Sequence, residues 1–498
     1  MSLTQFIRQS KNRDVDLDSL VYRLCTQNAF VGSSPTLLRS IFDLSGREKA
    51  SFHMPGHKGV CDFYSPEGRE KALSAISVFE IDTTELSGLD DLTCPVSLIK
   101  SIESGLAEAY GAEESFITLG GASHGLLAAM MSVAAPGKFV LVPRNTHRSV
   151  VNGLVLSGMD LVWYDPVFDS EWGIWGALDP SSIEARLSDL DMTDCAAVVV
   201  VSPTYGGAVS DIGALRSIVR RNSSNSVPLV VDEAHGAHFL PGVDAELPVS
   251  AVALGADLVV HSLHKSMPGL TQTGVIHRPR GSLVKGESVK AALRLVTSSS
   301  PSYPMLVSME IVAGLARQDE FLAGLKDLVE ELTRLRKRIK NLPGLALYEP
   351  QGGFDPLHIL FRSKFISSGK NLADSLESKG VFIEGSLGNG CLALAGVGTR
   401  KGDLEILEQA LQSISESSGE SFEEEAQEPI RLKQVMNPRE AFFSDCEIVE
   451  YDAAVGRISA ECVSPCPPGI PVLSPGSEVP PGLESSESVV RSVRVVKS

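Results

Sequence analysis

The 498-residue sequence lacks several features that would point to other classes of protein. It contains no run of about eighteen apolar residues, which a transmembrane helix would need. Its first residues, MSLTQFIRQSKNRDVDLD, lack the apolar core of a secretory signal peptide. Positive charge is also scarce, because 44 Lys and Arg residues stand against 62 Asp and Glu residues, a net charge of −18. Since affinity for nucleic acid comes mainly from Lys and Arg on phosphates, neither nucleic acid nor a membrane is an expected partner.

The eight cysteines form no CxxC pair. Cys462 and Cys466 have no matching second pair or histidine cluster, so a zinc site is not expected and we predict no metal. Scattered thiols in a long chain without a signal peptide are typical of a reducing compartment. We therefore expect a cytoplasmic location.

Apolar stretches alternate with helical patterns from about residue 110 onward. We expect strands at 115–119, 139–142, 161–164, 196–201, 227–231 and 258–260, and helices at 123–134, 146–156 and 210–221, the last capped by Ser210. Strands without polar alternation, separated by helices, indicate an α/β fold with a mostly parallel sheet covered on both faces. In such sheets ligands bind at the carboxyl ends of the strands.

The composition changes along the chain in a way that predicts several segments. We expect an N-terminal extension at 1–35 and a large domain at 36–320. A small α+β domain is expected at 321–414, and it opens with an amphipathic helix at 321–342. An acidic linker at 415–429, a C-terminal domain at 430–475 and a flexible tail at 476–498 follow.

Polar features stand at the predicted strand ends. Gly120, Gly121, Ala122 and Ser123 form a turn that opens a helix, where backbone N–H groups can bind phosphate, although a tight turn without a ligand fits equally well. His147 follows the next strand and could stack on a flat ring, while a capping or core histidine is the commoner case. Residues 201–207, VSPTYGG, offer hydroxyls at a third strand end and are not specific alone.

Two further strand ends carry charged side chains. Asp232 follows five apolar residues, and a buried carboxylate there is costly unless a cation such as a protonated pyridine nitrogen pairs with it. An ordinary strand-ending acid is the alternative. Lys265 follows the last strand and would ordinarily be a solvated surface charge, but a lysine amine is also the nucleophile that forms Schiff bases. Ser262 and His264 beside it could hold phosphate oxygens.

The order of these features matters more than any one of them. A phosphate cup, a ring-stacking face, an acid for a pyridine nitrogen and a lysine for an aldehyde are what pyridoxal 5'-phosphate (PLP) requires. Their occurrence together at strand ends predicts PLP as the cofactor and Lys265 as the residue that meets its aldehyde.

Further motifs resemble one known family, the bacterial ornithine/lysine/arginine decarboxylases. They are residues 51–59 (SFHMPGHKG), 82–92 (DTTELSGLDDL), 144–149 (RNTHRS), 232–236 (DEAHG), 261–265 (HSLHK), 437–443 (NPREAFF), 456–461 (GRISAE) and 465–471 (PCPPGIP). The resemblance implies fold type I, the aspartate-aminotransferase fold, with a PLP-binding large domain built on a mostly parallel sheet and smaller α+β C-terminal domains. It also implies a homodimer or higher homo-oligomer with active sites at the interface.

The family's residue roles carry over to matching positions in this sequence. Lys265 would bind the cofactor's aldehyde, and Asp232 would pair with its pyridine nitrogen. His147 would stack on one face of the ring, with Ala234 on the other and His235 also among the cofactor-binding residues. The resemblance implies that the phosphate is held by Gly120, Gly121, Ala122, Ser123, Ser262 and His264.

The implied reaction is loss of CO2 from arginine, lysine or ornithine to give agmatine, cadaverine or putrescine, in polyamine metabolism. The distal cation of the substrate could be received by a carboxylate among Glu85, Asp90, Asp91 and Glu461, each of which could equally be structural. Gly121 and Ala122 replace the usual hydroxyl residues of the family's phosphate turn, and Cys466 replaces its usual aromatic residue. Without the extra N-terminal domain of the large members, the sequence resembles the short form.

Two alternatives stay open at this point. An aminotransferase of the same fold could use Arg400 to hold the α-carboxylate of its substrate. A PLP-binding but catalytically idle regulatory partner is the other possibility, and the intact Lys265, Asp232 and His147 argue against it.

Overall fold

The computed structural model describes residues 50–53, 82–86, 89–243, 246–416, 422, 426–465, 468–483 and 491–497. The chain divides into two units, 1–49 and 50–498, and all described residues belong to the second. The predicted N-terminal extension, most of the motif at 51–59, most of the acidic linker and Cys466 therefore lie outside the described residues.

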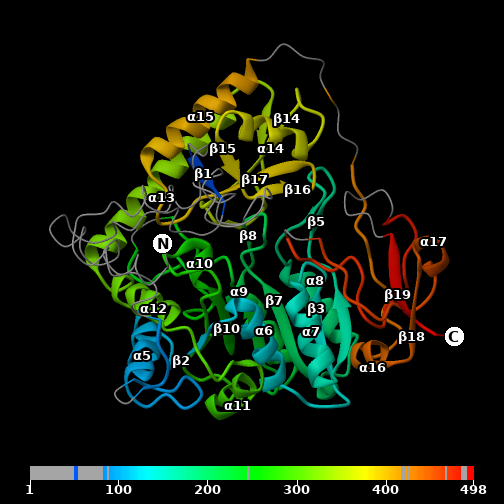
Figure 1. Ribbon diagram of the computed structural model, residues 1–498. Coiled ribbons are helices and arrows are strands. Elements are labelled where there is room, and N and C mark those ends of the chain that lie inside the picture. Colours follow the sequence, from blue (N-terminus) through cyan, green and yellow to red (C-terminus); the bar gives the residue numbers. More distant parts are fainter. Residues whose placement is uncertain are drawn as a thin grey trace, which may run out of the picture. The chain divides into compact units, whose positions relative to one another are not determined.

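The largest sheet in the described part of the chain has seven strands in the order β2-β11-β10-β9-β7-β3-β4 (Figure 1). The strands are β2 (Glu114–Thr118), β3 (Phe139–Pro143), β4 (Asp160–Tyr164), β7 (Cys195–Val201), β9 (Leu229–Asp232), β10 (Leu258–Ser262) and β11 (Gly274–Arg278). Only β11 runs antiparallel to its neighbours, β10 and β2, and the other pairs are parallel. The predicted mostly parallel sheet is confirmed.

Helices pack on both faces of this sheet. The helices of the large domain are α5 (Leu98–Tyr110), α6 (Gly121–Ser132), α7 (Arg148–Ser157), α8 (Pro180–Ser188), α9 (Ile212–Asn222), α10 (Leu263–Ser266), α11 (Gly286–Val296) and α12 (Tyr303–Leu315). Val230 packs in one core cluster with residues of α6 and α7, whereas Val231 packs in another with residues of α8 and α9. Successive side chains on a strand point to opposite faces of the sheet. Because helices cover both faces, both side chains must be apolar, which explains why apolar and polar residues do not alternate along these strands.

The predicted cap of the helix at 210–221 is wrong by one residue. The N-cap of α9 is Asp211, whose side chain accepts a hydrogen bond from the Ala214 amide at 2.9 Å. Ser210 is buried and its Oγ atom instead accepts from the Leu178 amide. A carboxylate carries the negative charge that the positive end of a helix favours, so Asp211 is well suited to the position.

A second, antiparallel sheet has the strand order β12-β14-β17-β16. Its domain contains β12 (Leu345–Leu347), β14 (His358–Ser363), β15 (Val381–Ile383), β16 (Gly385–Leu387), β17 (Gly390–Leu394), α13 (Asp319–Lys340), α14 (Gly369–Ser378) and α15 (Lys401–Ser415). The predicted amphipathic helix is confirmed as α13, which buries its apolar stripe, including Leu332 and Leu335. Short pairings attach β15 to β1 (Ala50–Phe52) and β13 (Gly353–Phe354) to β8 (Ala208–Val209).

The remaining described elements are β5 (Phe168–Asp169), β6 (Ile174–Trp175), α16 (Pro438–Phe443), β18 (Cys446–Glu450), α17 (Tyr451–Ala454) and β19 (Ser492–Val496). The prediction that residues 476–498 form a flexible tail is wrong for β19, which pairs along its whole length with β18. Val493 and Val495 are fully buried, so this valine-rich end stabilises the C-terminal domain. The other domain boundaries stay predictions. No helix among the described residues has the length and apolar character of a membrane span.

Candidate active site

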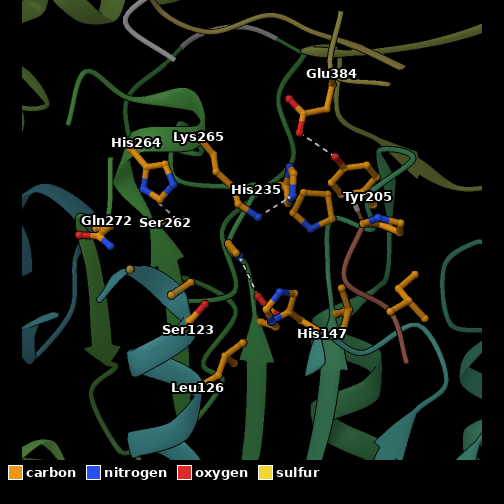
Figure 2. Close-up of a pocket in the computed structure, with 18 of the residues that line it drawn as sticks. Ser123, Leu126, His147, Tyr205, His235, Ser262, His264, Lys265, Gln272 and Glu384 are labelled. Atoms are coloured by element: carbon orange, nitrogen blue, oxygen red, sulfur yellow. Dashed lines mark hydrogen bonds between the residues drawn. The ribbon is translucent and has the colours of Figure 1, made fainter. Parts of the chain in front are cut away.

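A cavity of about 420 Å³ lies where the parallel strands of the large sheet end. This volume falls within the range of roughly 300–1,000 Å³ that is usual for small-molecule sites. Its walls include the Gly-rich turn after β2, His147 after β3, Asp232 at the end of β9 and Lys265 after β10 (Figure 2). The structure thus brings together residues that the sequence places at separate strand ends.

Lys265 lies on α10, the single helical turn that follows β10 directly. Leu263 anchors this turn because its side chain is completely buried in the core. The Nζ atom of Lys265 is 2.8 Å from Nε2 of His235, and Figure 2 shows the two side chains meeting inside the cavity. The amine is therefore directed into the cavity and not to the protein surface.

Asp232 ends β9, the strand beside β10, and is 5% exposed. Its Oδ1 atom accepts one hydrogen bond from the Ala234 amide at 3.1 Å. Burial raises the pKa of the Asp232 carboxyl, and the positive charge of Lys265 acts in the opposite direction. No cationic side chain lies within ion-pair distance of Asp232 among the described residues. A buried carboxylate in this state suits a cationic ligand group, such as a protonated ring nitrogen.

The turn between β2 and α6 faces the same cavity, and Gly120, Gly121, Ala122 and Ser123 all line it. Gly121 has a φ of 66°, a conformation that a residue with a side chain rarely adopts, and its amide donates to the Gln272 carbonyl at 2.7 Å. The N-terminus of a 12-residue helix with its positive dipole end is thereby directed at the cavity. This arrangement can bind a phosphate with backbone N–H groups alone.

Ser262 and His264 line the cavity beside this turn. The Oγ atom of Ser262 lies 3.3 Å from Nδ1 of His264, which also lies 3.2 Å from the Thr273 carbonyl. A side chain added at Gly121 would come 3.7 Å from the His264 ring, so the two segments are close neighbours. Hydroxyl and imidazole groups therefore stand opposite the helix terminus, as an anion site requires.

His147 combines the two possibilities that the sequence left open. It is the N-cap of α7, where its Nδ1 atom accepts from the Ser149 amide at 3.2 Å, and its ring also lines the cavity (Figure 2). Burial first, and then the charges of Lys265 and Arg148, lower its pKa to about 4. His147 is thus a neutral ring at neutral pH, held in a fixed orientation by the helix that it caps.

The cavity has further walls that the strand-end patterns did not single out. These are formed by Gln272, Glu384, Pro468 and Ile470, while Asn145 and Tyr205, which also line the cavity, belong to the strand-end segments 144–149 and 201–207. The Tyr205 hydroxyl donates to Oε1 of Glu384 at 2.8 Å. Glu384 follows β15 in the small domain, where no local pattern marks it. Pro468 and Ile470 belong to the motif at 465–471, so their signal was present in the sequence.

The carboxylates proposed from the sequence for the distal cation do not line this cavity. Asp90 accepts the amides of Val96, Ser97 and Ile99 and caps α5. Burial alone would raise the pKa of Asp90, but hydrogen bonds from backbone amides, first those of Ser97 and Val96, hold it below its usual value.

The other three carboxylates have local partners as well. Asp91 accepts from the Thr93 amide, Glu461 from the Arg494 amide and Glu85 from the Thr84 hydroxyl. Arg400, the candidate for an aminotransferase, lies outside the cavity at the N-cap of α15. No group of three or more potential metal ligands occurs in the part of the chain that the structure describes.

The fold and the cavity define the class of protein. A mostly parallel sheet with a lysine amine and a buried acid at the ends of neighbouring strands is the architecture of a fold type I enzyme. The solved lysine decarboxylase LdcF of Francisella novicida has the same fold, with a TM-score of 0.68 over 96% of this chain and 81% of that chain at 16% identity.

Family models identify the chain more closely. The model described as Orn/Lys/Arg decarboxylase, major domain, matches residues 35–357, and the model of the C-terminal domain matches residues 420–492. The chain therefore belongs to the Orn/Lys/Arg decarboxylase family, and this membership implies PLP. An arginine decarboxylase of Bacillus subtilis is 32% identical over 87% of this chain and 88% of its own length. The uncharacterized protein YaaO of the same organism is 31% identical over 92% and 94%.

Proposed function

We propose that this chain catalyses the PLP-dependent decarboxylation of a basic amino acid to its amine and CO2, with arginine as the first substrate to test. One observation carries the proposal. The amine of Lys265 and the buried carboxylate of Asp232 meet in one cavity with the N-terminus of α6. Arginine comes first because the relative named arginine decarboxylase matches most of both chains.

The cavity fits PLP in charge and shape. The cofactor supplies an electron sink for the charge left on the substrate when CO2 departs. Asp232 would hold the protonated ring nitrogen, which relieves the cost of burying its carboxylate. His147 and Ala234, both cavity residues, would contact the ring, and Lys265 would hold the aldehyde. The phosphate would lie at the α6 terminus with Ser123, Ser262 and His264.

The residues of the chain also prepare the reaction. Lys265 can carry a proton on Nζ inside the cavity, which suits it to return a proton to the substrate carbon. A charged Asp232 would favour a protonated ring nitrogen on the bound cofactor, and a neutral His147 would add no opposing charge. Pro468 and Ile470 place apolar side chains along the cavity wall.

Glu384 is the best candidate to bind the distal cation of the substrate. Apart from Asp232, it is the only carboxylate among the described residues that line the cavity. The Tyr205 hydroxyl holds one of its oxygens and so orients the carboxylate. A guanidinium can bind a carboxylate through two parallel hydrogen bonds, which favours arginine over a point charge. A homodimer and a cytoplasmic location remain predictions from the resemblance.

The test is CO2 release by the purified chain with PLP, with arginine, lysine and ornithine supplied separately. We expect release from one substrate, loss of at least about 10³-fold in Lys265→Ala, and no change in Lys340→Ala, an exposed lysine that pairs with Glu349. A keto acid in place of CO2 would identify an aminotransferase. Bound cofactor without turnover of any substrate would identify an idle partner and overturn the proposal.

A further inference from the structure

A network of buried polar side chains, formed by His235, His358, Asp355 and His238, leads away from Lys265 into the protein. His235 Nε2 contacts Lys265 Nζ at 2.8 Å, and His235 Nδ1 lies 3.3 Å from Nε2 of His358. His358 Nδ1 lies 2.9 Å from Oδ2 of Asp355. The other carboxylate oxygen of Asp355 lies 3.0 Å from Nε2 of His238. No local pattern in the sequence marks this polar network, because Asp355 and His358 belong to a segment more than a hundred residues from His235.

These groups are closed off from solvent. Asp355 and His238 are completely buried, and His358 and His235 are 2% and 8% exposed. Neither Oδ2 of Asp355 nor Nδ1 of His358 has a hydrogen-bond partner among the described residues, and their 2.9 Å contact with each other is an ion-pair contact. Water cannot replace these contacts without opening the core, and the arrangement is therefore fixed by the fold.

The backbone around Asp355 holds the polar network in place. The Asp355 amide donates to the Gly207 carbonyl, and its carboxylate accepts the Leu357 amide at 3.0 Å. Gly207 has a φ of 92°, and a side chain there would come within 2.7 Å of Cβ of His358. The glycine thus allows the close approach of the small domain's strand β14 to the loop after β7.

The two ends of the polar network allow only one direction of hydrogen bonding. An ionised carboxylate can only accept, and a lysine ammonium can only donate. With one proton on each ring, His358 places its Nδ1–H toward Asp355 and accepts at Nε2 from His235 Nδ1–H. His235 then presents the lone pair of Nε2 to Lys265. While Lys265 is an ammonium, an added proton on either ring would set two donors against each other between Asp355 and Lys265.

We infer that the buried carboxylate of Asp355, relayed by His358, fixes the tautomer of His235. In that tautomer His235 Nε2 accepts a hydrogen bond from Lys265 Nζ in both protonation states of the amine. One N–H bond of the amine is thereby directed at His235, and the lone pair of the neutral amine is left facing the cavity. His235 touches the reacting amine, whereas His358 and Asp355 are positioning residues that act through it.

The charges of these groups agree with this arrangement. Burial alone would raise the pKa of Asp355, but His238 and His358 hold it far below its usual range, so the carboxylate is ionised. Burial and then the charge of Lys265 keep the pKa of His235 well below its ordinary value. The titratable groups around His235 are Lys265, His358, His147, His264 and Tyr205. Those around Asp355 are His238, His358 and Arg336.

The role of Lys265 as the reacting amine rests on the proposed function. The positions of the protons on the His235 and His358 rings do not rest on it. The test therefore uses the full chain without cofactor and measures the pKa of Lys265. Trace labelling with an amine-reactive anhydride across a pH series, followed by peptide mass spectrometry, gives this pKa for one lysine. Turnover is not needed, so a failed decarboxylation assay would leave this result unaffected.

Two variants break the polar network at different points. Asp355→Asn removes the acceptor that sets the direction of the hydrogen bonds. His358→Asn keeps a donor for Asp355 at the place of Nδ1 but has no atom at the place of Nε2. In both we expect the pKa of Lys265 to fall by about one to two units, the size of one charge-assisted hydrogen bond. The control is Asp257→Asn, a completely buried carboxylate paired with Arg220 at the opposite end of β10, which leaves the pKa unchanged.

The outcomes separate a relay from a simple charge effect. A fall in Asp355→Asn alone would show that only the field of the carboxylate matters, and unchanged values in both would also overturn the proposal. If either variant does not fold, His235→Gln and His235→Leu test the first contact. Gln keeps an acceptor oxygen near the place of Nε2 and retains the pKa, whereas Leu lowers it; equal values in this pair would refute the inference.

Discussion

The cavity has a floor and a rim that differ in how the chain builds them. The floor consists of Gly120–Ser123, Asp232 and Ser262–Lys265, all at strand ends of one sheet. The rim consists of Glu384, Pro468 and Ile470, which come from the small and C-terminal domains. The floor is set by local strand and turn patterns, while the rim depends on packing between distant segments. We infer that the floor defines the chemistry and the rim defines the substrate.

The largest expected effect is on the floor. In Asp232→Asn the neutral amide cannot hold a protonated ring nitrogen, so the maximal rate of CO2 release should fall about 10³-fold, or about 4 kcal/mol. The rate at saturating arginine and PLP measures this. The buried but remote Asp257→Asn serves as the matched control. A loss below about tenfold would remove Asp232 from the chemistry.

A change in the rim should alter affinity more than rate. In Glu384→Gln the carboxylate charge is lost while the Tyr205 contact remains possible. We expect KM for arginine to rise about 30-fold, or about 2 kcal/mol, with kcat nearly unchanged. The exposed Glu349→Gln should leave both constants as they are. A fall in kcat with constant KM would place Glu384 with the floor and erase the distinction.

An effect that is smaller for each pH unit is expected at His147, a cavity residue that belongs to neither the floor nor the rim. The folded-state pKa of His147 is about 4, below its unfolded value of about 6.5, so the unfolded chain binds the proton first. Its contribution to stability is complete above pH 6.5 and is lost as pH falls to 4. His147→Gln should reduce the slope of unfolding free energy against pH in this window by about 1.4 kcal/mol per unit. Urea titrations at several pH values measure the slope, and equal slopes in both proteins would show that burial does not lower the pKa of His147.

Sequence patterns were sufficient for the parallel strands and β2, because buried strands are apolar on both faces and helices follow a different period. They did not predict the antiparallel strand β11. They failed where a choice between neighbouring polar residues depends on geometry, as for Ser210 and Asp211. They also failed for β19, whose valines lie in a stretch dominated by Pro, Ser and Glu. Glu384 and Asp355 were not singled out, because Tyr205 and His238, which contact them, are more than a hundred residues away in the chain, and His358 three residues after Asp355 is no signal alone.

The pairing of β18 with β19 has a consequence for the order of events in the cell. Ala460 and Glu461 are hydrogen-bonded to Arg494 in β19, and the loop that follows carries Gly469 against the His147 ring. The Gly469 carbonyl also accepts the Arg148 amide at 2.9 Å. The wall over His147 is therefore tied to residues 492–496. A nascent chain can form the sheet early, but it cannot complete this wall of the cavity until residues 492–496 have been synthesised.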